Sequence, residues 1–231
     1  MIIEGEEYDT AFFDKGPKFM HFRPAVTVLT SVEFDHADIF QDLNHVRKAF
    51  GGFLSRLEST SLLLAFDGDE NVKDLLSEAH CRIEPYGQND HSAWQIANVQ
   101  IEAPWSRFDL LKSGKPFGTF KTRLIGRHNL MNALPVIAIA DHLGTPVEKI
   151  SAALETFEGV KRRQQIRGEK NRVTVMDDFA HHPTAVRETL EAVKSFYADK
   201  RLIAVFEPRT NSSMRNVFQN IYPQSFDPAD L

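Results

Sequence analysis

Short apolar runs alternate along this chain with segments whose apolar residues recur at helical spacing. Residues 25–30 and 61–66 are compact apolar runs typical of buried strands. Residues 42–57, between them, repeat leucine, valine and phenylalanine at intervals that form one helical face. Residues 72–79 predict a short helix, and residues 82–83 predict a short strand. This alternation predicts an α/β fold in which helices cover a mostly parallel sheet.

The pattern changes near residue 94. Residues 94–124 alternate around a Ser-Gly-Lys-Pro turn, which predicts antiparallel β ribbons at the edge of the sheet. Two helices are predicted next, at 128–143 before a glycine and at 146–157 after a proline start.

A segment rich in lysine, arginine and glutamine, residues 159–168, predicts a linker. Strand 173–177, helix 184–197 and strand 202–206 are then predicted, in the order of a second α/β unit. We therefore predict a first domain at 1–158, a linker at 159–168 and a second, partial Rossmann-like domain at 169–231.

Both ends of the sequence carry incomplete patterns. Residues 1–4 have the composition of the last part of a buried strand, and nothing precedes them. Residues 222–231 show no obvious final helix or strand. A sheet with unsupplied neighbours is an awkward design for an intact domain. We therefore expect a fragment of a larger protein.

Composition narrows the functional classes. The 231 residues carry 27 Lys and Arg against 32 Asp and Glu, a formal charge of −5, so no general attraction to nucleic acid or to an anionic membrane is expected. The single cysteine, Cys81, cannot form an internal disulfide. Neither a signal-peptide pattern nor a stretch of about 18 apolar residues is present. The cytoplasm is the expected compartment.

The densest candidate chemistry is Asp177-Asp178-Phe179-Ala180-His181-His182-Pro183, between a predicted strand and a predicted helix. Such carboxyl ends of strands carry the ligand sites of α/β proteins. Asp178 could accept hydrogen bonds from ribose hydroxyls, as acidic residues at strand ends do in dinucleotide folds. His181 and His182 are adjacent and cannot easily face one point, so we expect one to contact substrate and the other to pack or cap.

Glu4 and His36 each follow a predicted strand. If those strands are neighbours, the carboxylate and the imidazole meet at one sheet edge and suit Mg²⁺, which takes few protein ligands beside water and phosphate oxygens. The alternative is that both are solvated loop residues.

Asn129 and Asn132, which follow His128, share one face of a helix start and could read the edge of an adenine ring. Alternatively, Asn129 caps the helix and Asn132 points to water. Arg162 and Arg163 in the linker could bind a phosphate between the domains, because guanidinium groups match its geometry. A charged, solvated hinge is the alternative.

Four motifs in order resemble those of the Mur ligases, ATP-dependent amide-forming enzymes of bacterial cell-wall synthesis. They are Ile3-Glu-Gly-Glu-Glu-Tyr-Asp-Thr-Ala-Phe-Phe-Asp-Lys15, Glu33-Phe-Asp-His-Ala-Asp-Ile-Phe40, Asp177-Asp-Phe-Ala-His-His-Pro-Thr184 and Glu207-Pro-Arg-Thr-Asn211. The resemblance spans essentially the whole chain. Within the family it is strongest to the members that join a murein tripeptide to UDP-N-acetylmuramate.

The resemblance implies a central ATPase domain, most of which is present, and about half of a C-terminal domain that brings the amine substrate. It implies that Glu4 and His36 hold Mg²⁺, that His128, Asn129 and Asn132 surround adenine, and that Asp178 binds ribose. Arg162 or Arg163 would approach the phosphates as catalytic cations. His181 would line the substrate cleft in a catalytic and binding role, beside Phe179, where the alanine-adding members have tyrosine. Arg209 would contact the peptide carboxylate.

One family motif is absent: the sequence has no Gly-rich loop ending in Gly-Lys-Thr. Those backbone amides and that lysine cradle the β and γ phosphates. We therefore predict that this polypeptide alone is not catalytically competent.

Three other hypotheses remain open. The chain could belong to the ligases that add L-alanine to UDP-N-acetylmuramate, which share the nucleotide chemistry. It could be a metal-dependent hydrolase that gathers Glu4, His36, Asp178 and His181 within about 2 to 2.5 Å of one ion. It could also be a non-catalytic remnant that binds only nucleotide or a partner.

Overall fold

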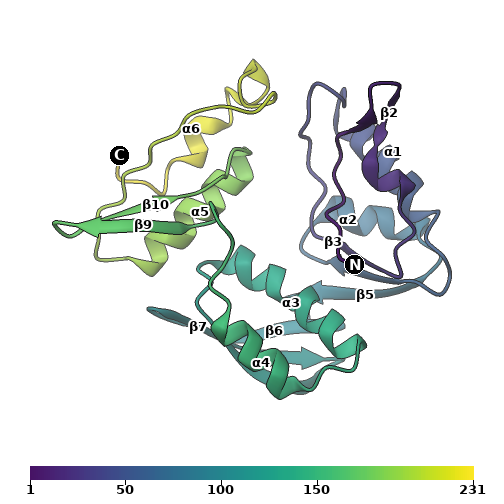
Figure 1. Cartoon of the computed structure of the whole chain (residues 1–231), viewed down its shortest axis with the longest axis horizontal. Helices are drawn as coiled ribbons and strands as arrows, with labels where there is room; N and C mark the ends of the chain where they lie inside the picture. The colour runs from purple at the N-terminus through teal and green to yellow at the C-terminus, as the bar shows by residue number, and fades with distance from the viewer. The chain divides into compact units, whose positions relative to one another are not determined.

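A computed structural model describes residues 1–231, and the chain divides into two units, Met1–Gln95 and Ile96–Leu231. Figure 1 labels the helices and strands within them. No helix combines the length and the apolar character needed to cross a bilayer.

The first unit contains three parallel strands in register: β3 (Val26–Leu29), β4 (Leu62–Phe66) and β5 (Arg82–Gly87). Strand β4 is the central one of the three, and its first four residues are buried, as a strand between two neighbours requires. These strands confirm the predicted parallel arrangement.

Helices α1 (Leu43–Leu54) and α2 (Glu70–Leu75) follow β3 and β4, and the short 3-10 helix η2 (Leu76–Glu78) extends α2. Each α-helix begins at an aspartate cap: the Asp42 carboxylate accepts from the His45 amide at 2.8 Å, and Asp69 accepts from Asn71 and Val72. The apolar faces of both helices join one core with the sheet, whose buried members include Phe19, Leu29, Val32, Phe40, Val46, Phe50, Leu54, Leu63, Val72 and Leu75.

The first residues do not form the buried strand end that the sequence predicts. Met1 and Ile2 are fully exposed, and residues 1–4 belong to no strand because their backbone does not pair with another strand. Strand pairing begins instead at a hairpin of β1 (Asp9–Ala11) and β2 (Asp14–Pro17), followed by the 3-10 helix η1 (Lys18–His21).

Strand β6 (Trp94–Glu102) pairs in parallel with β5 through Tyr86 and Trp94, and completes a sheet ordered β3-β4-β5-β6-β7-β8. Strands β7 (Trp105–Lys112) and β8 (Lys115–Thr122) are antiparallel and are joined by a tight turn. The predicted antiparallel ribbon at the sheet edge is therefore confirmed.

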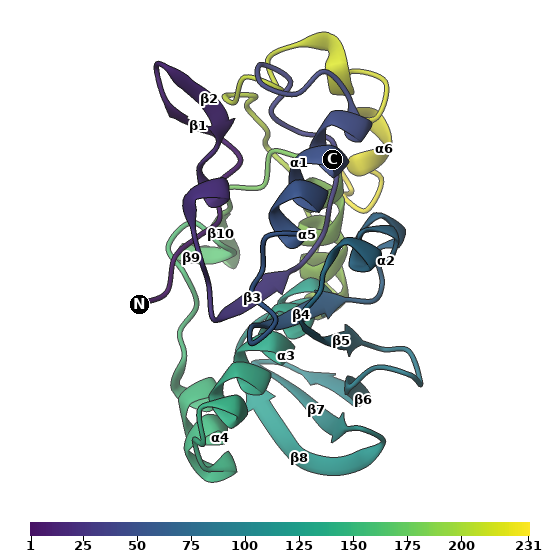
Figure 2. The same ribbon diagram turned by 90° about the vertical axis from the view of Figure 1, so that its right-hand side faces the viewer.

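Two helices of the second unit follow, as predicted: α3 (Arg127–His142) and α4 (Val147–Thr156). Helix α4 packs against β8, and Figure 2 shows the two side by side. Most residues of helix α3 between Leu130 and Ala138 are buried, whereas Asn132 and Val136 are exposed.

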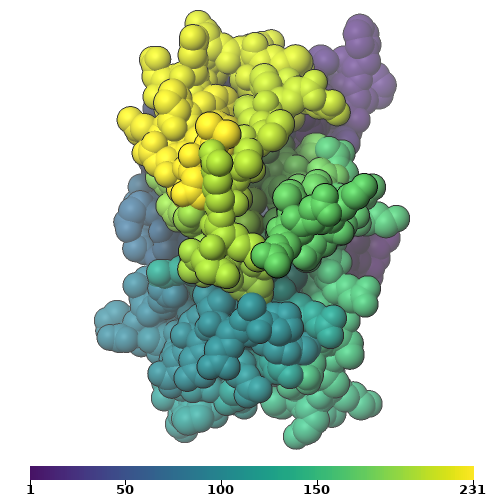
Figure 3. All heavy atoms as spheres, turned by 90° about the vertical axis from the view of Figure 1, so that its left-hand side faces the viewer, coloured from purple at the N-terminus to yellow at the C-terminus, as the bar shows by residue number.

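The remaining elements are β9 (Gln165–Lys170), β10 (Val173–Asp177), α5 (Pro183–Phe196), the 3-10 helix η3 (Asn216–Phe218) and the short helix α6 (Tyr222–Ser225). Strands β9 and β10 form an antiparallel hairpin. In Figure 3 the side chains of this hairpin, in green, stand at the surface, and Ile166, Val173 and Val175 are more than half exposed.

Three predictions for this region were wrong. The second half of the predicted linker, from Gln165, is strand β9, because its backbone pairs with β10 although its side chains are polar and exposed. Residues 202–206 form no strand: the Ala204 amide donates to the Leu231 carbonyl at 2.8 Å, and the Asp230 amide donates to that of Leu202. The C-terminal residues, predicted without a helix, contain α6.

Candidate functional site

The first turn of α3 carries His128 and Asn129, half-buried in the second unit. Gly126, just before the helix, has a φ of 93°, and a Cβ there would overlap the Cβ of Ala192 in α5. This close approach brings α5 to the start of α3, where His128 Nδ1 lies 4.0 Å from the Glu188 carboxylate. Burial lowers the pKa of His128 below its ordinary value, against the opposing effect of Asp178 and with a smaller lowering from Arg163.

Asp178 lies directly after β10, where the sequence predicts a ribose-binding carboxylate. Its Oδ1 accepts from the Ala180 amide at 2.7 Å, and its Oδ2 accepts from the Gln164 amide at 2.7 Å. The Gln164 side chain in turn contacts Asn129, whose Nδ2 donates to Gln164 Oε1 at 3.1 Å. The structure therefore connects Asn129, Gln164 and Asp178 in one hydrogen-bonded chain.

Asn132 is exposed one turn further along α3, and its side chain makes no hydrogen bond in the structure. It shares a helix with Asn129, as the spacing predicts, but only Asn129 is joined to the chain that leads to Asp178. Asn129 does not cap the helix. Its Nδ2 instead donates to the Ile125 carbonyl at 2.7 Å, in the segment that leads into the helix.

Arg162 and Arg163 surround the ring of Phe179. The guanidinium carbons lie 4.8 Å and 5.8 Å from the ring centroid, within cation–π range. Arg162 also has an ion-pair contact with Asp177, with its Nε 3.8 Å from Oδ2. The side chains of Arg162, Arg163 and Asp177 all remain accessible to solvent. The two guanidinium groups therefore lie beside one aromatic ring and have no buried ion-pair partner.

The two adjacent histidines have different surroundings. His181 lies edge-on to Phe179, with ring centroids 5.3 Å apart, and its carbonyl accepts from the Tyr222 hydroxyl at 2.5 Å. His182 caps α5 by accepting from the Thr184 amide and packs on Phe218. His182 therefore packs and caps, as expected of one histidine of the pair. The Nδ1 atom of His181 lies 3.0 Å from the Phe179 carbonyl oxygen, and its contact with substrate stays a prediction.

Arg209 lies in an irregular segment after residues 202–206. Its guanidinium is 2.6 Å from the Glu207 carboxylate, and both side chains are about 70% exposed, at 72% and 68%. Such an exposed pair contributes little to stability and can exchange partners with a ligand.

The first unit holds the predicted metal residues. His36, at a left-handed φ of 51°, has its Nε2 3.7 Å from the Glu7 carboxylate and its ring 4.4 Å from that of Tyr8. Burial raises the pKa of Glu7, partly offset by the hydrogen bond of its own backbone and by His36. Glu4 is exposed and forms no ion pair with His36. Its negative charge nevertheless contributes to the raised pKa of Glu7.

A carboxylate beside an imidazole fits the partial coordination that Mg²⁺ takes in phosphate-transfer sites, where water and phosphate oxygens complete the shell. No group of three or more His, Cys, Asp and Glu side chains is arranged to hold a metal ion. The hydrolase hypothesis requires such a group of four, so the structure gives it no support.

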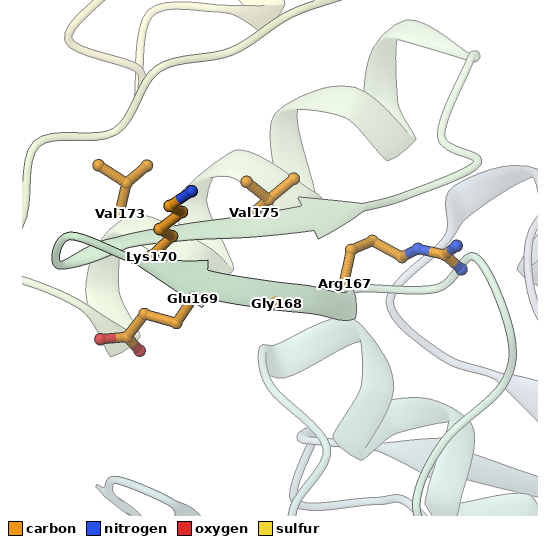
Figure 4. Close-up of a pocket in the computed structure, with 6 residues that line it drawn as sticks. All are labelled: Arg167, Gly168, Glu169, Lys170, Val173 and Val175. Carbon is orange, nitrogen blue, oxygen red and sulfur yellow. The ribbon is translucent and has the colours of Figure 1, made fainter.

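A shallow pocket lies on the β9–β10 hairpin, away from these residues in sequence. Arg167, Gly168, Glu169, Lys170, Val173 and Val175 line it. In Figure 4 the two valines and Lys170 point to one side of the hairpin and Glu169 to the other. Its walls belong to a single exposed hairpin, so it lacks the convergent polar groups of a ligand site.

Sequence reasoning missed Gln164, Glu7 and Tyr222. Glu7 lies within the motif from Ile3 to Lys15 that resembles the Mur ligases, so membership of that motif was a sequence signal for it. Gln164 follows the two arginines directly, but its role depends on a left-handed backbone that no local pattern announces. Tyr222 is 41 residues from the carbonyl it contacts, and no sequence signal could have found it.

Comparison with known proteins defines the class. The model of the Mur ligase middle domain matches residues 12–140, and that of the Mur ligase glutamate ligase domain matches residues 162–227. The chain belongs to the Mur ligase family.

Two individual relatives show which members of the family the chain resembles. The chain is 37% identical over 230 residues to the UDP-N-acetylmuramate–L-alanyl-γ-D-glutamyl-meso-2,6-diaminoheptandioate ligase of Escherichia coli K12, covering 99% of this chain and 50% of that protein. It is 32% identical over 231 residues to the UDP-N-acetylmuramate–L-alanine ligase of Salinibacter ruber, covering 100% of this chain and 47% of that protein.

A crystal structure of a murein peptide ligase from Psychrobacter arcticus matches 99% of this chain and 47% of its own, with 34% identity and a TM-score of 0.69. The chain thus spans about half the length of the relatives it matches.

Proposed function

We propose that this chain carries the nucleotide-binding part, and some of the amine-binding part, of an ATP-dependent ligase that joins a murein tripeptide to UDP-N-acetylmuramate in peptidoglycan recycling. The observation that carries the proposal is the hydrogen-bonded connection from Asn129 through Gln164 to Asp178, with His128 on the same helix turn. It links a candidate base-binding residue to a candidate ribose-binding carboxylate. The names of the E. coli and P. arcticus relatives support the tripeptide branch.

The proposed domains are 1–158 for ATP binding and 169–231 for the start of the ligase domain, with a connecting segment at 159–168 whose second half belongs to strand β9. The two family matches, at 12–140 and 162–227, support a boundary in this region. Arg162 and Arg163 then lie at the junction of the two domains.

The proposed reaction has two steps. ATP transfers its γ-phosphoryl group to a carboxylate oxygen of the sugar's lactyl group, which yields an acyl phosphate and ADP. The tripeptide amine then attacks the acyl carbon, the carbon–oxygen bond to phosphate breaks, the amine loses a proton, and an amide and inorganic phosphate result. Arg162 and Arg163 would offset charge on the transferred phosphoryl group, as cations do in other phosphoryl transfers.

Substrate contacts are proposed for Phe179, His181 and Arg209. His181 would contact the substrate and take part in catalysis, Phe179 would form an apolar wall, and Arg209 would bind a peptide carboxylate with paired donors. Asp178 would bind ribose, and His128, Asn129 and Asn132 would surround adenine.

Glu4 and His36 are the proposed Mg²⁺ residues, with Glu7 as a further candidate because it is the carboxylate nearest to the imidazole. When bound, the ion would neutralise phosphate charge.

Calorimetric titration of MgATP into the 231-residue chain tests the nucleotide site. We expect saturable binding of one nucleotide per chain, weakened about ten- to a hundredfold by Asp178→Asn, since hydrogen bonds to a charged group contribute about 1.5–3 kcal/mol. Asp199→Asn, an exposed aspartate of the same unit, is the matched control and should bind as the wild type. Failure of the wild-type chain to bind ATP would overturn the proposal.

The L-alanine-adding ligases remain the second candidate, because relatives of that branch are also more than 30% identical. Ligand-observed NMR with the tripeptide and with L-alanine separates the two. Binding of the tripeptide that is lost in Arg209→Ala supports the first branch, whereas binding of alanine alone supports the second. A chain that binds nucleotide but neither amine would fit the non-catalytic hypothesis.

A further inference from the structure

Gln164 is held in an unusual backbone conformation for a residue that is not glycine. Its φ is 49°, in the left-handed region, and its amide donates to Asp178 Oδ2 at 2.7 Å. Left-handed conformations of ordinary residues persist only when the surroundings enforce them, and they concentrate at ligand sites. The backbone at this position therefore helps to fix the carboxylate proposed for ribose.

The Gln164 side chain is fixed from the other direction. Asn129 Nδ2 uses one of its protons on the Ile125 carbonyl at 2.7 Å and the other on Gln164 Oε1 at 3.1 Å. Because a carbonyl oxygen accepts at Ile125, the Asn129 amide must present nitrogen there. The same nitrogen then requires an oxygen from Gln164, so the orientation of both amides follows from the network.

This arrangement leaves two groups of opposite character. Gln164 Nε2 is buried and has no hydrogen-bond partner, whereas Asn129 Oδ1 receives no donor from the protein. Buried polar atoms in folded proteins nearly always have partners, and the exceptions call for an explanation. A donor and an acceptor carried by two hydrogen-bonded amides at a proposed nucleotide site are the functional groups that recognise the edge of a base.

We propose that Gln164 is a further base-recognition residue: its Nε2 donates to a ring nitrogen of adenine while Asn129 Oδ1 accepts from the exocyclic amine. Adenine carries a ring acceptor next to an amine donor, whereas guanine carries an oxygen acceptor in place of that donor. Guanine would leave Asn129 Oδ1 facing an acceptor, so the pair selects adenine. This inference rests on the proposed function, because it assigns the base specificity of the same nucleotide site.

Two substitutions separate recognition from structural support. Gln164→Glu retains an oxygen for Asn129 and replaces the Nε2 donor with an acceptor. Gln164→Met removes both polar atoms at similar length and adds no charge. Gln100→Glu, on the exposed end of β6 in the same unit, is the control for the added charge.

The experiment titrates each 231-residue variant with ATP, GTP and the 1-deaza, 3-deaza and 7-deaza analogues of ATP, and thermal unfolding establishes that each variant is folded. Ratios of affinity within one variant cancel any repulsion of the triphosphate, because all the probes carry the same phosphates. In the wild type and in Gln100→Glu, we expect one deaza analogue to bind about five- to tenfold more weakly than ATP, the size of one hydrogen bond. In Gln164→Glu and Gln164→Met that ratio should fall to about one, and the preference for ATP over GTP should decrease.

A wild-type ratio that persists in both variants would overturn the inference. So would an equal loss for all probes, which would show that Gln164 only supports the fold. If Gln164→Met does not fold, Gln164→Glu alone decides. If the wild-type chain binds ATP without preference among the deaza analogues, the inference fails and the proposed function survives. If it binds no nucleotide, both fail.

Discussion

His128 shows how burial at one residue sets a pH dependence. Its pKa is lowered from 6.5 by desolvation, so the folded chain favours the neutral imidazole. Between the lowered pKa and 6.5 the unfolded chain binds more protons than the folded chain, and stability therefore rises with pH across that window. Below the folded pKa both states are protonated, and this contribution is lost.

We therefore expect the difference in melting temperature between the wild type and His128→Gln to depend on pH. The wild type should lose stability relative to the variant as the pH falls from about 7 towards 5, while the difference should be constant above about pH 7.5. Calorimetric scans at half-unit intervals measure this, and the variant subtracts the contribution of the other eight histidines. A difference that is independent of pH would show that His128 titrates normally.

The residues proposed to bind Mg²⁺ lead to a second prediction at this scale. Mn²⁺ is a paramagnetic substitute for Mg²⁺, so it should broaden the imidazole signals of His36 in the NMR spectrum at concentrations that leave His142 unaffected. We expect His36→Gln to weaken Mn²⁺ binding about tenfold, as loss of a metal-site group typically does. Comparison of Glu4→Gln with Glu7→Gln identifies which carboxylate binds the ion. The Glu7 carboxylate lies 3.7 Å from His36 Nε2, whereas Glu4 is the residue that the resemblance to the Mur ligases implies. If His36→Gln, Glu4→Gln and Glu7→Gln all bound Mn²⁺ as tightly as the wild type, this metal site would be excluded.

Much of the candidate site could be named at the residue scale, because strand ends and motif order point to His128, Asn129, Asp178 and His181 without coordinates, and their roles stay predictions. The connecting residues could not be predicted. The contacts of Gln164 depend on its left-handed φ, which the local sequence does not predict. Glu4, Glu6 and Glu7 lie within four residues, and the local sequence does not determine which of these carboxylates lies nearest to His36.

At the scale of elements, the approach of α5 to the start of α3 depends on a glycine. Gly126→Ala must adopt an unfavourable φ of 93° and must also displace Ala192 or the His128 ring. The first effect costs about 1–2 kcal/mol and the second, an overpacking, about 1–3 kcal/mol.

Gly114→Ala provides the matched control, because its φ is 73° but nothing lies within 4 Å of the added Cβ. We expect urea unfolding to show a larger loss of stability for Gly126→Ala than for Gly114→Ala, by about 1–3 kcal/mol. ATP affinity should fall only in the Gly126 variant, because His128 and Asn129 move with the helix. Equal losses of stability in the two variants would mean that α5 moves away from the added Cβ without a cost in free energy.

Hydrophobic periodicity predicted the helices and strands from β3 to α4, and also β10 and α5, because their apolar faces have partners within the chain. It missed the β1–β2 hairpin and the polar strand β9, whose pairing leaves no apolar pattern. Two wrong predictions lie where partners are lacking. Residues 202–206 have the pattern of a strand, yet Val205 is 95% exposed and the segment pairs only with the last two residues. Residues 1–4 fail for the same reason. A strand pattern states which residues can be buried, but a neighbouring strand decides whether they are.

At the scale of the whole molecule, the chain combines the residues proposed for the base, ribose and peptide with no phosphate loop. In the family that loop supplies the amides and the lysine that neutralise the β and γ phosphates, and its absence here removes the groups that would position the γ-phosphoryl group for transfer. Binding of the adenosine moiety does not depend on that loop, whereas phosphoryl transfer does. Affinity for ATP and catalytic turnover should therefore separate in this polypeptide.

We accordingly expect the 231 residues to release no phosphate above background from MgATP in the presence of UDP-N-acetylmuramate and the murein tripeptide, under conditions in which the full-length E. coli relative turns over. A coupled assay for ADP and phosphate measures this, and calorimetry on the same preparation establishes whether nucleotide is bound. Because correct positioning and charge stabilisation supply most of the acceleration in phosphoryl transfer, their loss should reduce the rate by more than about a thousandfold. Turnover near that of the full-length enzyme would mean that Arg162, Arg163 and the cation near His36 suffice to hold the triphosphate.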